Sequence, residues 1–350
     1  MAYVLDGCDR VVSAADLERL LDKVTSSAGE GGSLFPSDSV SWKVNREAGL
    51  FLAAGYATLL QLAHPWVASA IAEHSKTLHD PIGRFHQTFR VMFTLAFGSV
   101  EQASTTARHM HRKHQDIRGT MPHAVGEFAA GSGYEANTIN ALLWVYATLI
   151  DTSVRAYNLI LPPLTSEERE QYYAESRMSA SFFGIPPDAW PRDWQRFVEY
   201  RDSMFACDTL AVSPVARDIA EQVLSGAGSW LRIPSWYRAL TAHLLPERLR
   251  EEFGLVYGER EKRSAERALS WMRSIYLLLP DGVRFVGPYR EALAKLNGKS
   301  RPSLSVRVSN KLWVGEASLF SLNTSKQFEV QVEQAFRPAP SRTKEKNFHR

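Results

Sequence analysis

The stretch of sequence that decides the fold runs from His64 to Gly119. Its polar and small residues come in groups, in the order His64-Pro65, Glu73-His74-Ser75, Asp80-Pro81, Arg84-Phe85-His86-Gln87-Thr88, Phe97-Gly98 and His111-Arg112-Lys113-His114-Gln115-Asp116-Ile117-Arg118-Gly119. Two segments within it carry the end signals of helices. Each of them also has a polar residue where an apolar one is expected, and these exceptions indicate a functional site.

The first of these helices is expected over Pro81–Phe97. Asp80 is a good N-cap and proline suits the first helical position. Gly98 stands where a glycine lets the chain leave a helix through a left-handed conformation. At about 100° per residue, the main apolar stripe of this helix comprises Ile82, Phe85, Phe89, Met92 and Ala96.

A second face of the same helix contains Arg84, Thr88, Val91 and Leu95. Because Val91 and Leu95 are apolar, this face is also predicted to be covered, with Arg84 and Thr88 buried one turn apart. A buried guanidinium costs several kcal/mol unless an anion or a strong acceptor meets it. The anion is either a carboxylate such as Glu73, which is a purely structural pairing, or part of a ligand.

The second helix begins at Ser99, where Ser99 and Gln102 form a capping-box pattern, and its end is expected at Gly119. His114 interrupts its apolar stripe, which is otherwise Ala103, Ala107, Met110 and Ile117. A core-facing histidine is either a hydrogen-bonded structural residue or a metal ligand. The second interpretation includes haem, because neutral imidazole is the usual proximal ligand of haem iron. The small side chains of Ala103 and Ala107 would let a flat macrocycle approach the helix. The residues alone leave both interpretations open.

As an ordered set, these motifs resemble the family of haem-dependent oxygenases that includes the latex-clearing rubber oxygenases and the mycophenolic-acid pathway oxygenase MpaB. The resemblance covers roughly residues 40 to 290. It implies an all-α fold, a large helical bundle enclosing one b-type haem, in which His114 binds the iron and Arg84 and Thr88 lie near the haem's other face. It also implies an oxidoreductase that uses dioxygen on a small apolar substrate, such as an isoprenoid or another alkene, with an electron donor that the resemblance does not name. The resemblance continues through Tyr134, Trp144, Asp151, Tyr172-Tyr173, Gly184-Ile185-Pro186 and Leu245-Pro246.

One position departs from the rubber-cleaving members of that family. Those members have Arg-x-x-Lys-Thr, in which the lysine can occupy the sixth position of the iron, whereas this chain has Gln87 there. An amide is a poor iron ligand beside an amine. We therefore expect no lysine-capped resting state, and rubber is not the expected substrate.

Two other interpretations stay open at this point. His111 and His114, three residues apart on one helix, could form a non-haem metal site with a carboxylate such as Glu73 or Asp151. Alternatively, the chain is a non-catalytic helical lipid-binding protein. Asp151 has two further interpretations, since it either orients a metal-bound histidine or makes an ordinary hydrogen bond or ion pair at a helix edge.

The composition of the chain limits which partners and which cellular compartment are expected. The chain has 350 residues and a net charge of +3, which gives no reason to expect a nucleic-acid partner. Two cysteines, Cys8 and Cys207, are compatible with a reducing compartment, and residues 1–10 lack the pattern of a signal peptide, so a cytoplasmic location is expected. The 25 residues Ala48–Ala72 contain no charged side chain. They are predicted to form buried helices broken near His64-Pro65, with peripheral membrane contact left open.

Three parts of the chain are expected. Residues 1–39 form an N-terminal helix and linker, residues 40–298 the haem-binding oxygenase domain, and residues 299–350 a C-terminal extension. In the extension, Leu304–Val308 and Phe328–Val332 alternate like strands of a small β-hairpin. The composition of its last residues, from Arg337 to Arg350, predicts disorder.

Overall fold

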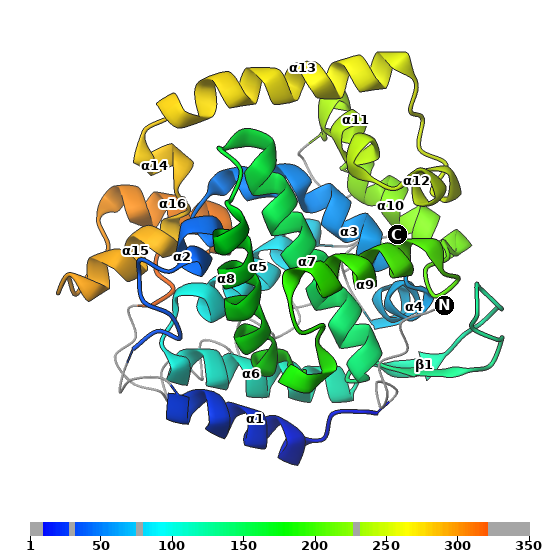
Figure 1. The fold of residues 1–350 in the computed structure, drawn as a ribbon, viewed down its shortest axis with the longest axis horizontal. Coiled ribbons are helices and arrows are strands. Elements are labelled where there is room, and N and C mark those ends of the chain that lie inside the picture. The colour runs from blue at the N-terminus through cyan, green and yellow to red at the C-terminus, as the bar shows by residue number, and fades with distance from the viewer. Residues whose placement is uncertain (1–9, 28–31, 75–79, 227–231, 321–350) are drawn as a thin grey trace, which may run out of the picture.

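The computed structural model describes residues 10–27, 32–74, 80–226 and 232–320. Within these ranges the chain is almost entirely helical, which confirms the predicted all-α class (Figure 1). The one sheet of this part of the chain pairs β1 (Arg118–Thr120) with β2 (Gly133–Glu135) in antiparallel register. The helices are α1 (Ala14–Ser27), α2 (Val40–Asn45), η1 (Ala48–Ala53), α3 (Ala54–Leu62), α4 (Pro65–His74), α5 (Pro81–Phe97), α6 (Val100–Gln115), α7 (Ile139–Ile160), α8 (Ser166–Ser179), η2 (Ala180–Phe183), η3 (Pro187–Ala189), α9 (Trp194–Ala206), α10 (Pro214–Ser225), α11 (Ser235–Leu244), α12 (Glu247–Glu252), α13 (Glu259–Ile275), η4 (Tyr276–Leu278), α14 (Asp281–Arg284), α15 (Gly287–Leu296) and α16 (Leu304–Val314), with η marking 3-10 helices.

The helix α7 is the centre of the bundle (Figure 1). Its side chains are buried on nearly every side, including those of Trp144, Ile150 and Tyr157. A helix that is apolar all round must be covered by other helices. Accordingly α7 packs against η1, α2, α3, α8 and α13.

The uncharged stretch Ala48–Ala72 is split into η1, α3 and α4, as expected for buried helices that break at a proline. The axes of the two halves, Ala48–Leu62 and Pro65–His74, are bent by 100° at His64-Pro65. Among the described residues, no single helix is long and apolar enough to cross a membrane, and this bent pair passes the same test only when its halves are taken together.

The helices α5 and α6 pack against each other and begin as predicted. The Asp80 side chain accepts a hydrogen bond from the Gly83 amide, and Ser99 with Gln102 forms a complete capping box. The helix α5 also ends at Phe97, as predicted, but two features of the helix ends differ from the prediction. Gly98 is extended rather than left-handed, with φ −73°, and α6 ends at Gln115, before Gly119. A side chain at residue 98 would come within 2.5 Å of the Thr94 carbonyl oxygen, so close approach explains this glycine.

Helices from both ends of the chain cover α5 and α6. The helix α1 lies along α6 (Figure 1), and the Glu18 carboxylate of α1 accepts hydrogen bonds from the Arg108 guanidinium. The helix α16 packs against α5, whose His86 Nε2 and Arg90 Nε donate hydrogen bonds to the carbonyls of Leu312 and Val314. The cationic side chain of Arg90 suits a helix C-terminus, where the free carbonyls carry partial negative charge.

One prediction for the C-terminal part of the chain is corrected by the structure. Leu304–Val308 is not a strand but the start of α16, because Ser303 caps it and the left-handed Gly315 ends it. Phe328–Val332 and the predicted disorder of residues 337–350 lie outside the described residues.

Candidate active site

Arg84 and Thr88 lie on the N-terminal half of α5, where none of residues 82–90 is buried. The prediction that their face of the helix is covered holds for Val91 and Leu95 but is wrong for Arg84 and Thr88. The physical reason is that tight packing on α5 begins only at Val91. Both polar side chains therefore border open space one turn apart.

The Arg84 guanidinium lies in a recess rather than on a protruding surface. Its side chain is accessible, yet enough protein surrounds it for burial to lower its pKa. Among the described residues, no carboxylate lies within ion-pair distance of Arg84. Glu73, the predicted structural partner, instead accepts a hydrogen bond of 2.7 Å from the Tyr134 hydroxyl. The structural pairing of Arg84 with Glu73 is therefore wrong.

His114 is half-buried on α6 and lies within electrostatic range of Arg84. Burial, with smaller contributions from the Arg84 guanidinium and the neighbouring His111 ring, lowers the pKa of His114 to about 4. Its imidazole is therefore neutral at pH 7 and keeps one nitrogen lone pair. The predicted stripe of α6 also faces inward. However, Ala103 and Ala107 are fully buried in the core and border no open space.

Asn137 holds the His114 side chain. Its Nδ2 donates a hydrogen bond of 3.1 Å to the backbone carbonyl of His111, and its side chain also bonds to His114 and raises the pKa of that residue. Since the Nδ2 of Asn137 already donates to the His111 carbonyl, its amide oxygen is the group left to accept from the imidazole. Asn137 therefore orients the His114 ring.

The role of Asn137 was missed from the sequence. An asparagine just before an apolar helix predicts an N-cap, but the residue that caps α7 is Thr138. Since Asn137 is buried one residue earlier, its amide is directed to α6 instead. The one signal that could have indicated this is its position shortly after the histidine-rich end of α6.

The structure does not bring His111 and Asp151 together with His114 as metal ligands. His111 is buried, and its Nε2 bonds to the Val12 carbonyl at 2.9 Å. Asp151 accepts hydrogen bonds from Tyr56 and Arg201, which is the ordinary helix-edge role considered for it. Within the described residues, no three His, Cys, Asp or Glu side chains form a group that could hold a metal ion.

The Glu73-His74 pair and Gly119 belong to one structural contact. Glu73 bonds to Tyr134 of β2, and His74 bonds to the carbonyl of Arg118 in β1. A side chain at residue 119 would come within 2.6 Å of the Tyr134 hydroxyl and 2.7 Å of the Glu73 carboxylate. Gly119 is therefore needed for close approach, and these residues attach the end of α4 to the sheet.

His64, the remaining histidine of the motif, is buried beside the rings of Trp66 and Phe128. Burial lowers its pKa to about 4. Its Nδ1 has no hydrogen-bond partner among the described residues. The neighbours of its ring are aromatic side chains rather than Arg84 or His114, so His64 is a residue of the core.

Taken together, the fold and these side chains define a helical protein with a cationic recess beside a neutral, amide-held histidine. Comparison with known families then identifies it: the chain belongs to the family described as "ER-bound oxygenase mpaB/B'/Rubber oxygenase, catalytic domain", whose model matches residues 42–274, two thirds of the chain. Searches of curated proteins and of solved structures gave no match. Membership makes the chain an oxygenase-type oxidoreductase, as the resemblance implied.

Proposed function

We propose that this chain is a haem b-dependent oxygenase that uses dioxygen to oxidise a small apolar substrate at a carbon–carbon double bond, as in an isoprenoid or another alkene. The observation that carries the proposal is the relationship of Arg84 to His114. A recessed guanidinium without a carboxylate partner among the described residues lies within electrostatic range of a neutral imidazole. A recessed cation of this kind favours an anionic ligand.

The residues present fit a haem. Arg84 would pair with a propionate group of a bound haem, and the neutral imidazole of His114 would hold its iron. The hydrogen bond from His114 to Asn137 is of the kind that metal-bound histidines make with their second nitrogen. When bound, the haem iron supplies the activation of dioxygen.

The side chains of this chain then have separate roles. His114 holds the iron through the ring nitrogen that is not bonded to Asn137. Arg84 and Thr88 donate hydrogen bonds to a propionate or toward dioxygen, where one well-placed donor is worth about 3 kcal/mol of charge stabilisation. Ile82 and Phe85, which are 38% and 37% exposed on the same half of α5, offer an apolar surface to the substrate and reduce its contact with water.

Gln87 distinguishes this chain from the rubber-cleaving members. This position would therefore offer no lysine amine to a bound haem iron, since an amide is a poor iron ligand. Rubber is correspondingly not proposed as the substrate.

The non-haem alternative has less support. It requires the imidazole of His111, whose Nε2 is occupied by the Val12 carbonyl, and a carboxylate from Glu73 or Asp151, both of which have other partners. A purely lipid-binding role is not expected of a chain in a family of oxygenase catalytic domains.

An absorption spectrum of the purified protein tests the proposal. We expect a Soret band and, by pyridine-haemochrome assay, one haem b per chain. His114→Ala should abolish the Soret band while the far-UV circular dichroism of the helices is retained. Thr88→Ala should keep the haem but slow turnover by about a hundredfold, since it removes one donor. Full haem retention in His114→Ala refutes the ligand assignment, and a colourless protein with stoichiometric zinc or iron supports the non-haem alternative.

A further inference from the structure

One segment of the surface, residues 260–314, differs from the rest of the molecule in charge. It contains twelve Lys or Arg residues and four Asp or Glu residues, a net charge of +8. Because the whole chain carries only +3, the remaining residues are net acidic at −5. The slight positive charge of the chain is therefore the sum of a strongly basic segment and an acidic remainder.

The same segment also concentrates the exposed apolar side chains. Thirteen large hydrophobic residues are exposed among the described residues, and eight of them lie between Trp271 and Leu312. On α16, Leu304, Val308 and Leu312 form a stripe at four-residue spacing that faces solvent, each at least 68% exposed. Leu278, just after α13, is 81% exposed. Grouped exposed apolar residues mark an interaction surface, whereas scattered single ones do not.

The elements of this segment are neighbours in space. In Figure 1, α13 runs along one edge of the molecule and ends above α14, with α15 and α16 beside it. The helix α16 contacts α14 and α15, and η4 contacts α13. The basic helix α13 is thereby joined, through η4 and α14, to the group of helices that includes α16 with its apolar stripe.

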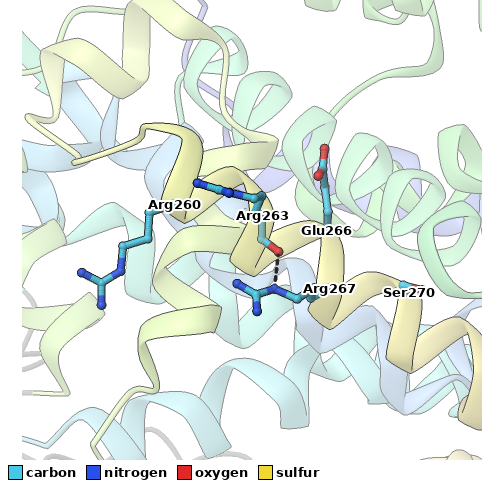
Figure 2. Close-up of a pocket in the computed structure, with 5 residues that line it drawn as sticks. All are labelled: Arg260, Arg263, Glu266, Arg267 and Ser270. Atoms are coloured by element: carbon cyan, nitrogen blue, oxygen red, sulfur yellow. Dashed lines mark hydrogen bonds between the residues drawn. The ribbon is translucent and has the colours of Figure 1, made fainter.

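The outer face of α13 is a row of arginines. Arg260, Arg263 and Arg267 recur at spacings of three and four and line a shallow hollow of the surface. Figure 2 shows their guanidinium groups extending to the same side, with the Glu266 carboxylate directed away from them. Among the residues that the structure describes, none offers these three arginines a carboxylate at ion-pair distance. Trp271 continues the row toward the apolar end and is 63% exposed.

We propose that the 260–314 segment is a docking surface for a membrane that contains anionic lipids. Arginines with exposed tryptophan and leucine side chains are the combination that binds the boundary between headgroups and acyl chains. The arginines meet the negative headgroups, while Leu278 and the stripe of α16 enter the apolar layer. A soluble acidic partner would satisfy the arginines but not the grouped leucines. The inference does not depend on haem, although an apolar substrate dissolved in a bilayer would become available at this surface.

Vesicle sedimentation with the full chain tests the proposal. The protein should bind vesicles of phosphatidylcholine with phosphatidylserine more tightly than vesicles of phosphatidylcholine alone, and high salt should weaken the binding. The variant Arg260→Gln/Arg263→Gln/Arg267→Gln should lose about fivefold in partition coefficient for each arginine, and only on the anionic vesicles. The variant Leu304→Ser/Val308→Ser/Leu312→Ser should weaken binding to both kinds of vesicle.

Matched controls lie on other parts of the surface. Met178→Ser replaces an exposed apolar residue of α8, and Arg192→Gln replaces an exposed arginine before α9. Both should bind vesicles as the wild type does. Circular dichroism confirms that every variant is folded. The proposal is overturned if the wild type does not bind anionic vesicles. It is also overturned if the arginine variant loses binding but the variant at residues 304, 308 and 312 does not. The surface would then recognise anionic groups without inserting apolar side chains into the bilayer.

Discussion

The side chains of Asn137 and His114 are hydrogen-bonded to each other, and Asn137 also donates to the backbone of His111. One asparagine thereby ties the start of α7 to the last turn of α6. The geometry makes Asn137 a positioning residue for the imidazole. Its removal should therefore loosen the histidine that is proposed to hold the iron.

Asn137→Ala should weaken haem binding by about 10- to 100-fold, because the imidazole loses the partner that fixes its tautomer and orientation. The measurement is a haem titration of the apoprotein followed by the Soret absorption. Asn140→Ala, at an exposed asparagine that is the second residue of α7, is the matched control and should titrate like the wild type. Equal affinities for the Asn137→Ala variant and the wild type would show that Asn137 does not position His114.

Arg84→Leu should raise the pKa of His114 in the apoprotein. The guanidinium is the second cause of the lowered value, after burial, so its removal leaves the imidazole easier to protonate. The pKa of His114 should stay below the ordinary histidine value of 6.5, because burial, the larger cause of the lowering, remains. Nitrogen-detected NMR titration of the histidines measures it, with Arg84→Lys as the control that keeps a positive charge. An unchanged His114 pKa in Arg84→Leu would mean that the two groups are not neighbours.

His64 should make the folded protein less stable in mild acid. Its pKa is about 4 in the folded state and 6.5 in the reference state, so the unfolded chain binds the proton more readily. The neutral form therefore stabilises the fold at neutral pH, and this stability is lost as the pH falls below 6.5, by about 2 kcal/mol at pH 5.

Urea unfolding of His64→Leu at pH 7 and pH 5 checks this. The variant should lose less stability between the two pH values than the wild type does. Phe128→Leu, which alters the same aromatic contact without a titrating group, should lower the free energy of unfolding equally at both. An identical pH dependence in His64→Leu and the wild type would rule out the contribution of His64.

Gly119→Ala should destabilise the protein by about 1–3 kcal/mol, because the added methyl group displaces the Tyr134 hydroxyl from Glu73. Gly133→Ala, in the partner strand, is the matched control. Its methyl group would meet nothing closer than the Gly119 carbonyl oxygen at 3.8 Å. Thermal unfolding distinguishes them, and a Gly119→Ala protein as stable as Gly133→Ala would contradict the close contact.

The sequence was most informative where helix ends carry local chemical signals. Proline at the first position and the Asp80 cap defined α5 to the residue, and the capping box of Ser99 defined the start of α6. These interactions join residues only three or four apart, so no knowledge of the tertiary fold is needed. The all-α class, by contrast, was implied by the resemblance to a family and not by these local signals.

The remaining errors concern contacts between residues that are far apart in sequence. The Tyr134 hydroxyl that requires Gly119, and the α6 backbone that engages Asn137, become visible only in three dimensions. The strand expected at Leu304–Val308 was an error of a different kind. Five alternating residues were given more weight than the cap at Ser303 and the glycine at 315, both of which predict a helix.

The helices that cover α5 and α6 lie partly outside the family match, which ends at residue 274. The Trp313 ring of α16 sits 4.2 Å from the Phe51 ring, and α1 reaches α6 through Glu18. A shortened protein that kept only the matched region would expose these aromatic and charged surfaces to solvent and would tend to aggregate. Workable expression boundaries for this chain should therefore begin before α1 and run past Phe320.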